Sequence, residues 1–232
     1  MKLNTNSNAY IIIYSAVLVV IVAFLLAFVY QALKPMQDAN VALDVKKQIL
    51  YSLNIRNLDG AEAEAKYAEV VKNEQEQDGQ KIYACEIDGK AVKVVSLKGM
   101  GLWGGISGFI SIHGDETPTV YGAYFNHESE TAGLGAEIKD SQAWQEKFIG
   151  KKVFVDGTQD VAISIVKKVE DPTTQVDVVT GATLTSNGVD DMIKAGLKDA
   201  GKRAVELFVK MQCTKDAPAD STATEEPKVE EE

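Results

Sequence analysis

The hydrophobic positions of the chain begin as one unbroken apolar run near the amino terminus. From Tyr10 the sequence reads "YIIIYSAVLVVIVAFLLAFVYQAL", and the next charged residue is Lys34. At about 1.5 Å per helical residue, this run is long enough to span the roughly 30 Å of a bilayer core. We therefore predict a transmembrane helix over residues 10–33, after an N-terminal tail at 1–9. A cleaved signal peptide is the alternative, although its apolar core is usually about 7–15 residues long and no A-x-A site follows here.

Beyond this run the apolar positions recur at helical spacing. Residues four apart share one face of a helix, and the apolar side chains that follow have this spacing: Val41, Val45, Ile49 and Leu53. They predict a helix that leaves the membrane. The stretch "DGAEAEAKYAEVVKNEQ", rich in Ala and Glu, predicts a second helix. We expect residues 34–80 to form a helical connector.

From Lys81 onward, strand-like patterns replace the helical spacing. The segment "KIYACEIDGKAVKVVSLKG" holds two strand-like runs separated by Asp88-Gly89, a dipeptide typical of a tight hairpin. Further strands are predicted at "GFISIHG", "TVYGAYFN", "KKVFVDG" and "DVAISIVKKV", and a helix is predicted at "DSQAWQEKFIG".

The last periodic segment follows Asn187 and predicts an amphipathic helix. Asn187 suits the N-cap, with Asp190 and Asp191 in the first turn. The apolar positions recur every three or four residues: Val189, Met192, Ile193, Leu197, Ala200, Ala204 and Phe208. Strands and helices are mixed without a βαβ rhythm, so the sequence predicts an α+β fold. We expect one mixed, largely antiparallel domain over residues 81–213, behind a single N-terminal transmembrane helix.

Charge adds a tail to this picture. The net charge is −10, and residues 214–232, "TKDAPADSTATEEPKVEEE", hold seven acidic residues and two lysines. This segment is predicted to be a disordered acidic tail because it has almost no apolar residue to bury. The remainder is mildly acidic, which argues against nucleic acid as a partner.

Cysteine and histidine positions argue against a metal site. The two cysteines, Cys85 and Cys213, have no metal-binding or redox spacing, and the two histidines are His113 and His127. Cys85 falls inside a predicted strand and is interpreted as a buried structural thiol.

The segment "GMGLWG" fits the pattern G-x-G-x-x-G of dinucleotide sites, but its context does not. A helix should follow, whereas the next residues, "GISGFISI", contain two more glycines and then alternate like a strand. We interpret the run as a flexible glycine loop that carries Trp103. This ring either lies against a flat cofactor or packs in the core.

A cluster of hydroxyl side chains in "DVVTGATLTSNG" is the strongest candidate site. Gly181 and Ala182 would let the backbone approach a bulky group, and the helix expected near Asn187 offers free N–H groups and a positive dipole end. Such a place suits a phosphate. The hydroxyl of Thr183, a few residues before the expected helix start, could also be esterified to it. The alternative is that these hydroxyls cap the helix and a turn.

At this point the chain resembles a known family. "TGATLTS" is similar to the [S/T]-G-A-T motif of FMN-binding domains in which a flavin transferase joins FMN to threonine through a phosphoester. Five segments stand in the order found in the C subunits of sodium-translocating NADH:quinone oxidoreductases: "LKPMQDANVALDVKKQIL", "GLWGGISGFISI", "HESETAGLGAEI", "WQEKFIGKK" and "TGATLTSNGV". The G subunits of Rnf-type electron-transport complexes share the anchor and the flavin motif and are the alternative within this resemblance.

The resemblance implies a cofactor and a role. FMN would be covalently bound, and the chain would relay electrons as a subunit of the membrane oxidoreductase without binding NADH or supplying a catalytic residue. The implied location is the bacterial inner membrane, crossed once, with the domain on the periplasmic side. The implied partners are the other subunits, the lipid bilayer and a flavin transferase. The implied cofactor-binding residues are Thr183 as covalent acceptor, Gly181, Ala182, Leu184, Thr185, Glu130, Thr131, Leu134 and Trp103.

Two details modify this expectation. Ala132 stands where the family usually has proline in E-T-P-G-L-G, so the loop should be looser before the cofactor binds. Lys167 and Lys168 end a predicted strand, where they would place positive charge near a phosphate or a reduced, anionic flavin; the alternative is a solvated strand end.

Two alternatives from other classes remain. One is a membrane-anchored binding or assembly module in which T-G-A-T is an ordinary capping turn and no flavin binds. The other is a flavin-dependent reductase that acts alone, for which the sequence offers no acid or base candidate.

Overall fold

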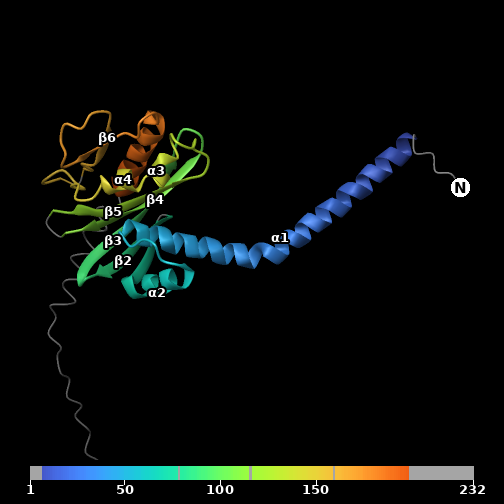
Figure 1. Ribbon diagram of the computed structural model, residues 1–232, viewed down its shortest axis with the longest axis horizontal. Coiled ribbons are helices and arrows are strands. Elements are labelled where there is room, and N and C mark those ends of the chain that lie inside the picture. Colours follow the sequence, from blue (N-terminus) through green and yellow to red (C-terminus); the bar gives the residue numbers. More distant parts are fainter. Residues whose placement is uncertain (1–6, 78, 115–116, 159, 199–232) are drawn as a thin grey trace, which may run out of the picture.

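The computed structural model of the 232-residue chain describes residues 7–77, 79–114, 117–158 and 160–198. A long helix leads into a domain built on one five-stranded sheet (Figure 1). In chain order the elements are α1 (Asn8–Ser52), α2 (Gly60–Val70), β1 (Val71–Gln77), β2 (Gln80–Ile87), β3 (Lys90–Met100), β4 (Gly105–His113), β5 (Thr119–His127), α3 (Glu137–Asp140), α4 (Gln142–Glu146), β6 (Ser164–Val166) and β7 (Gln175–Asp177). A further helix occupies residues 183–198.

Helix α1 joins the predicted anchor and the predicted connector in one continuous element. It has 45 residues, and Ser7 caps it by accepting a hydrogen bond from Tyr10 N–H at 3.2 Å. Among the described residues it is the one helix long and apolar enough to cross a membrane, and its apolar window is fully exposed. In Figure 1 the helix projects from the domain and bends along its length. Pro35 lies inside it, and a proline in a helix interior removes one hydrogen bond and bends the axis.

The main sheet is an antiparallel meander with strand order β1-β2-β3-β4-β5. The predicted hairpin is confirmed: Ile87 pairs with Lys90, and the turn residues Asp88 and Gly89 have φ of 49° and 73°. Both positive angles belong to the turn type that Asp-Gly favours. Together with the helices, this sheet makes the fold α+β, as the sequence predicts.

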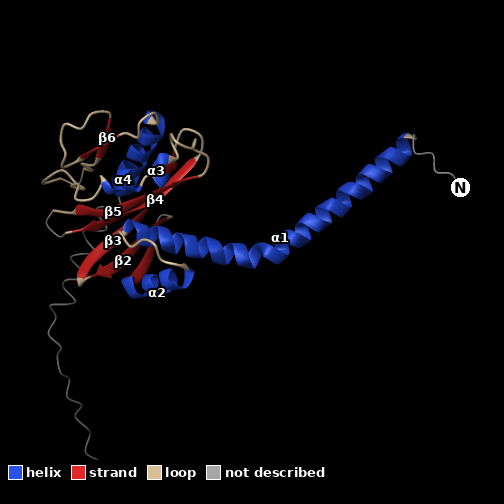
Figure 2. Cartoon of the chain, in the orientation of Figure 1, coloured by secondary structure: helices blue, strands red, loops and turns tan. Residues whose placement is uncertain are grey.

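Helices cover both faces of the sheet (Figure 2). On one face the end of α1 buries Ile49 and Leu53 against β2, β3 and β4. On the other face, α3, α4 and the helix of residues 183–198 bury the larger cluster, which includes Phe125, Trp144 and Phe148. This second face carries the candidate site.

The predicted helix over 59–75 is wrong in its last part. Helix α2 ends at Val70, and the residues from Val71 to Gln77 pair with β2 as the edge strand β1. The connector expected at 34–80 is therefore not helical throughout. The sequence of β1, VKNEQEQ, has good helix formers. The open edge of β2 overrides them because it offers a row of backbone hydrogen bonds.

The region between β5 and the last helix is less regular than predicted. The helix expected over 140–150 is split into α3 and α4, and the strand expected at 151–157 forms only two isolated bridges, Thr119 with Lys152 and Phe154 with Val161. The strand expected at 160–169 shortens to β6, which pairs in parallel with β7. The predictions at Ala200, Ala204, Phe208, Cys213 and 214–232 lie outside the described residues.

Candidate functional site: a helix start bordered by two loops

The last helix begins at Thr183, four residues before the expected cap at Asn187, which is therefore wrong as the N-cap. Gly181 takes a left-handed φ of 79°, which turns the chain into the helix. Ala182 N–H donates to the Val179 carbonyl at 3.0 Å, and the hydroxyl of Ser186 accepts from Val179 N–H at 3.0 Å. Residues 180–183, here called the TGAT turn, are thus closed by a serine from inside the helix.

The hydroxyls of the cluster differ in exposure. Thr185 and Ser186 are buried, at 1% and 0% exposure, and both are hydrogen-bonded. Thr180 is exposed, and Thr183 is half-buried with no hydrogen bond from its hydroxyl to any described residue. The first N–H groups of a helix lack intrahelical partners and lie at the positive end of its dipole. Thr183 therefore combines an available hydroxyl with a place that favours a phosphate.

Two loops border this turn. The GLWG loop, residues 101–104, connects β3 to β4 and is closed by a hydrogen bond from Gly101 N–H to the Gly104 carbonyl at 2.9 Å. The ETAGLG loop, residues 130–135, follows β5, and the Thr131 carbonyl accepts from Leu134 N–H at 3.1 Å and Ala136 N–H at 3.0 Å. These two hydrogen bonds close the loop on the Thr131 carbonyl.

The carboxylate of Glu130 connects the three segments. One oxygen, Oε1, accepts from Trp103 N–H at 2.8 Å, and the other, Oε2, accepts from the Thr185 hydroxyl at 2.7 Å. The backbone N–H of Glu130 donates to His127 Nδ1 at 3.3 Å. The side chain is buried, with 8% exposure. Glu130 therefore joins the ETAGLG loop to the GLWG loop and to the first turn of the helix.

This carboxylate is held in its ionised form. Burial raises the pKa of Glu130, but hydrogen bonds outweigh burial and bring its pKa below the ordinary value. They come from the backbone of Trp103, the Thr185 hydroxyl and the backbone N–H groups of Leu102 and Gly104. The GLWG loop thus binds an anion, which is the carboxylate of Glu130 and not an external phosphate. Strand β4 follows the loop directly, which confirms that the G-x-G-x-x-G match is not a dinucleotide site.

Glycines allow this close packing. A Cβ added at Gly101 or Gly135 would collide with Glu130, one at each carboxylate oxygen. A Cβ at Gly188 would collide with the Met100 carbonyl oxygen, because the helix lies with its backbone against the end of β3. The position of the helix start thus depends on small residues in three separate segments.

Accessible apolar side chains lie on the TGAT turn's neighbouring residues and on the two loops that border it. Trp103 is 68% exposed and Leu184 is 61% exposed, so the interpretation of Trp103 as a core residue is wrong. Leu134 is 44% exposed and lies over Gly181, where an added Cβ would stand 2.8 Å from Leu134 Cδ2. Met100 and Leu102 extend the same exposed set. Such a surface suits a flat ring more than a small polar ligand.

The candidate residues from the sequence therefore come together, with one exception. Trp103, the residues of the ETAGLG loop and the TGAT turn with Leu184 and Thr185 all belong to the three segments. Lys167 follows β6 and is exposed, and it forms no ion pair with any described residue. Its backbone lies near the approach to the turn, since Val178 N–H donates to the Val166 carbonyl at 3.0 Å.

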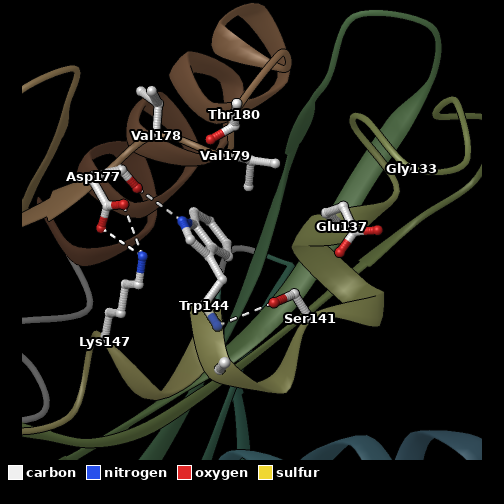
Figure 3. A pocket seen from close by; sticks show the side chains of 10 residues that line it. Gly133, Glu137, Ser141, Trp144, Lys147, Asp177, Val178, Val179 and Thr180 are labelled. Atoms are coloured by element: carbon white, nitrogen blue, oxygen red, sulfur yellow. Dashed lines mark hydrogen bonds and ion pairs between the residues drawn. The ribbon is translucent and has the colours of Figure 1, made fainter.

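A cavity of about 320 Å³ opens beside the TGAT turn, and sequence reasoning did not identify it. Gly133 and Thr180 are shared between its wall and the two segments described above. In Figure 3 Lys147 and Asp177 lie on one side of Trp144, and Ser141 and Glu137 lie on the other. Lys147 pairs with Asp177 at 2.7 Å, and Trp144 Nε1 donates to the Asp177 carbonyl at 2.8 Å. Asp177 heads the same hydroxyl-rich stretch, but no spacing in the sequence connects it to Lys147.

Comparison with known proteins gives this arrangement a class. A family model described as the FMN-binding domain matches residues 101–198, which contain both loops, the TGAT turn and the helix. This part of the chain thus matches the class of FMN-binding domains.

The relatives identify the family within that class. The C subunit of the Na(+)-translocating NADH-quinone reductase of Pseudomonas aeruginosa is 38% identical over 134 residues, which is 55% of this chain and 49% of that protein. The C subunit from Haemophilus ducreyi is 41% identical over 133 residues, covering 56% of this chain and 46% of that protein. The alignments thus span about half the length of these curated relatives.

Solved structures extend the match. The crystal structure of the C subunit of the Na(+)-translocating NADH-quinone reductase from Parabacteroides distasonis has 34% identity and a TM-score of 0.65, covering 72% of this chain and 94% of that one. Shewanella oneidensis NqrC, at 20% identity and a TM-score of 0.59, shows the same fold. The chain belongs to the family of C subunits of the Na(+)-translocating NADH-quinone reductase. These relatives favour this family over the G subunit of an Rnf-type complex.

Proposed function

We propose that this chain is an electron-relay subunit of a membrane-bound, sodium-translocating NADH:quinone oxidoreductase and that it carries FMN on Thr183 through a phosphoester. The observation that supports this most is the state of Thr183: it is the first helical residue, its hydroxyl has no hydrogen-bond partner among the described residues, and exposed Leu184 follows it directly. In the proposed linkage the Thr183 oxygen bonds to the phosphorus of FMN, and one water is lost overall.

The described residues fit such a group. Gly181 leaves open space in front of the turn except where Leu134 lies, and Ala182 is buried beneath it. The free N–H groups at the helix start would bind the phosphate oxygens. Leu184, Leu134, Trp103 and Thr131 are the accessible side chains that would line the ring, and Lys167 would add positive charge from the neighbouring strand.

FMN supplies the redox chemistry, since it can accept and pass on electrons. The protein's task is then to fix the flavin in place and leave its ring accessible to partners. The absence of an acid/base pair among the three segments is compatible with this role, because electron relay needs no proton donor at a substrate. We propose that NADH binds to another subunit.

The proposed setting rests on α1 for the membrane crossing and on the family resemblance for the side of the membrane. Residues 10–33 would cross the inner membrane once, and the domain would lie on the periplasmic side, where the other subunits of the complex and the flavin transferase reach it. Protease added to intact spheroplasts should cleave the domain; protection until lysis would contradict this orientation.

Attachment is tested by intact mass and in-gel flavin fluorescence of the denatured full chain, produced with and without a flavin transferase. The wild type should gain the mass of FMN less one water only when the transferase is present. Thr183→Ala should gain nothing, whereas Thr183→Ser keeps the hydroxyl and should be modified. Fragment mass spectra should place the added mass on residue 183. A wild-type chain that gains no mass with active transferase would instead indicate an anchored binding module.

A further inference from the structure

The side chain of Glu130 is turned away from the accessible surface of the site. Its two oxygens accept hydrogen bonds from Trp103 N–H and from the Thr185 hydroxyl, and it is the one buried acidic residue among those that the structure describes. The apolar residues that remain accessible around Thr183 lie on the same three segments that Glu130 joins. Glu130 could either contact the cofactor or connect segments of the protein, and its hydrogen bonds favour the second role.

We propose that Glu130 is a positioning residue: it fixes the GLWG loop relative to the first helical turn, which carries Thr183, and it does not itself touch the flavin. This inference rests on the proposed function, because flavin attachment is the step for which the hydroxyl is positioned.

Geometry gives each oxygen a separate task. Oε1 receives Trp103 N–H and thereby sets the direction of the GLWG loop. Oε2 receives the hydroxyl of Thr185, which lies two residues after Thr183 on the same helical turn. Loss of the carboxylate frees both contacts, whereas loss of the Thr185 hydroxyl frees only the contact to the helix.

The surrounding glycines indicate that the carboxylate must sit between the segments. Gly101 and Gly135 face opposite oxygens of Glu130, and a side chain at either position would occupy the space of the carboxylate. The ETAGLG and GLWG loops thus both lack a side chain at the point where Glu130 lies. A surface acid that merely approached the cofactor would impose no such requirement on two loops.

The test uses the full chain in detergent, labelled with fluorotryptophan. The chain has two tryptophans, so fluorine NMR gives Trp103 as the reporter of the GLWG loop and Trp144, in the core, as an internal reference. In Glu130→Gln the Trp103 resonance should shift while the Trp144 resonance stays in place. Glu86→Gln removes an exposed carboxylate on β2, outside the three segments, and is the matched control; it should move neither resonance.

The second measurement is the rate of flavin attachment by the transferase. Glu130→Gln should lower kcat/KM about tenfold, which is the effect of weakening one charge-assisted hydrogen bond. The fall should be in kcat, because the exposed turn can still bind the transferase. Thr185→Val should show the same fall without moving the Trp103 resonance as far, and Thr185→Ser should restore the rate. Thermal unfolding of each variant establishes that it is folded.

Several results would overturn the proposal. An unchanged Trp103 resonance together with an unchanged rate in folded Glu130→Gln would do so, as would an equal loss of rate in Glu86→Gln. If the wild type takes up no flavin at all, the proposed function fails, and the fluorine spectra alone then decide whether Glu130 positions the GLWG loop.

Discussion

Replacement of Gly188 by alanine tests the packing that places the helix start. In an exposed helix interior this change should stabilise the protein by about 1 kcal/mol, because alanine loses less backbone entropy than glycine. Here the new Cβ would collide with the Met100 carbonyl oxygen and would stand 3.3 Å from Gly101 Cα. Both neighbours are backbone atoms, so neither can rotate away.

The magnitude follows from these two opposing effects. Overpacking costs about 1–3 kcal/mol, and contact with the backbone of two successive residues, which cannot move away independently, favours the upper end. After the gain in helix propensity is subtracted, Gly188→Ala should destabilise the full chain by about 2 kcal/mol, which lowers Tm by roughly 4–8 °C for a protein of this size. The displaced helix start should also reduce flavin attachment at Thr183.

Gly196→Ala is the matched control in the same helix. Its Cβ would meet the end of the Leu97 side chain, which can adopt another rotamer, so the loss of stability should be smaller. Thermal and urea unfolding of the two variants and the wild type provide the comparison. A Gly188→Ala protein at least as stable as the wild type would refute the backbone contact between this helix and β3.

Three further predictions follow from the site and the core. Because the pKa of Glu130 is lowered in the folded protein, its contribution to stability is present above the ordinary glutamate pKa and is lost as pH falls through the folded value. The unfolding midpoint of the wild type should therefore fall more steeply in acid than that of Glu130→Gln. Trp144→Phe removes the hydrogen bond to the Asp177 carbonyl and part of the core, and urea unfolding should show a loss of about 1–3 kcal/mol. Burial raises the pKa of the Cys85 thiol to about 12, so peptide mapping after alkylation at neutral pH should find Cys85 unmodified in the folded chain and modified after denaturation.

Periodic apolar patterns predicted the long elements well. The Asp88-Gly89 hairpin and the amphipathic pattern through Val189 and Leu197 appear in the structure because local sequence and burial favour the same element. The strand β1 was missed since its polar residues have helix propensity and only the neighbouring edge of β2 selects the extended form. The ends of a helix or strand cannot be predicted from the spacing of apolar residues when they depend on a segment far away in the sequence.

The candidate site, too, was predicted only where local sequence was sufficient. The T-G-A-T and E-T-A-G-L-G segments were chosen by resemblance, and the structure brings them together. The start of the helix at Thr183 was missed because it depends on the left-handed conformation of Gly181 and on a hydrogen bond from Val179 N–H to the Ser186 hydroxyl, seven residues later in the chain. The connection through Glu130 spans 55 positions to Thr185, and no periodicity relates them.

The unbroken course of α1 has a consequence for encounter between redox centres. With residues 10–33 in the bilayer, the part of the helix that follows, residues 34–52, acts as a stiff arm of roughly 28 Å, at about 1.5 Å per residue, and Pro35 lies where the arm leaves the lipid. A domain on such an arm stays within a fixed range of distances from the membrane surface and does not diffuse through the whole compartment. In the proposed complex, a partner subunit held beside the anchor would meet the domain at an effective concentration set by arm length, on the millimolar scale for short tethers.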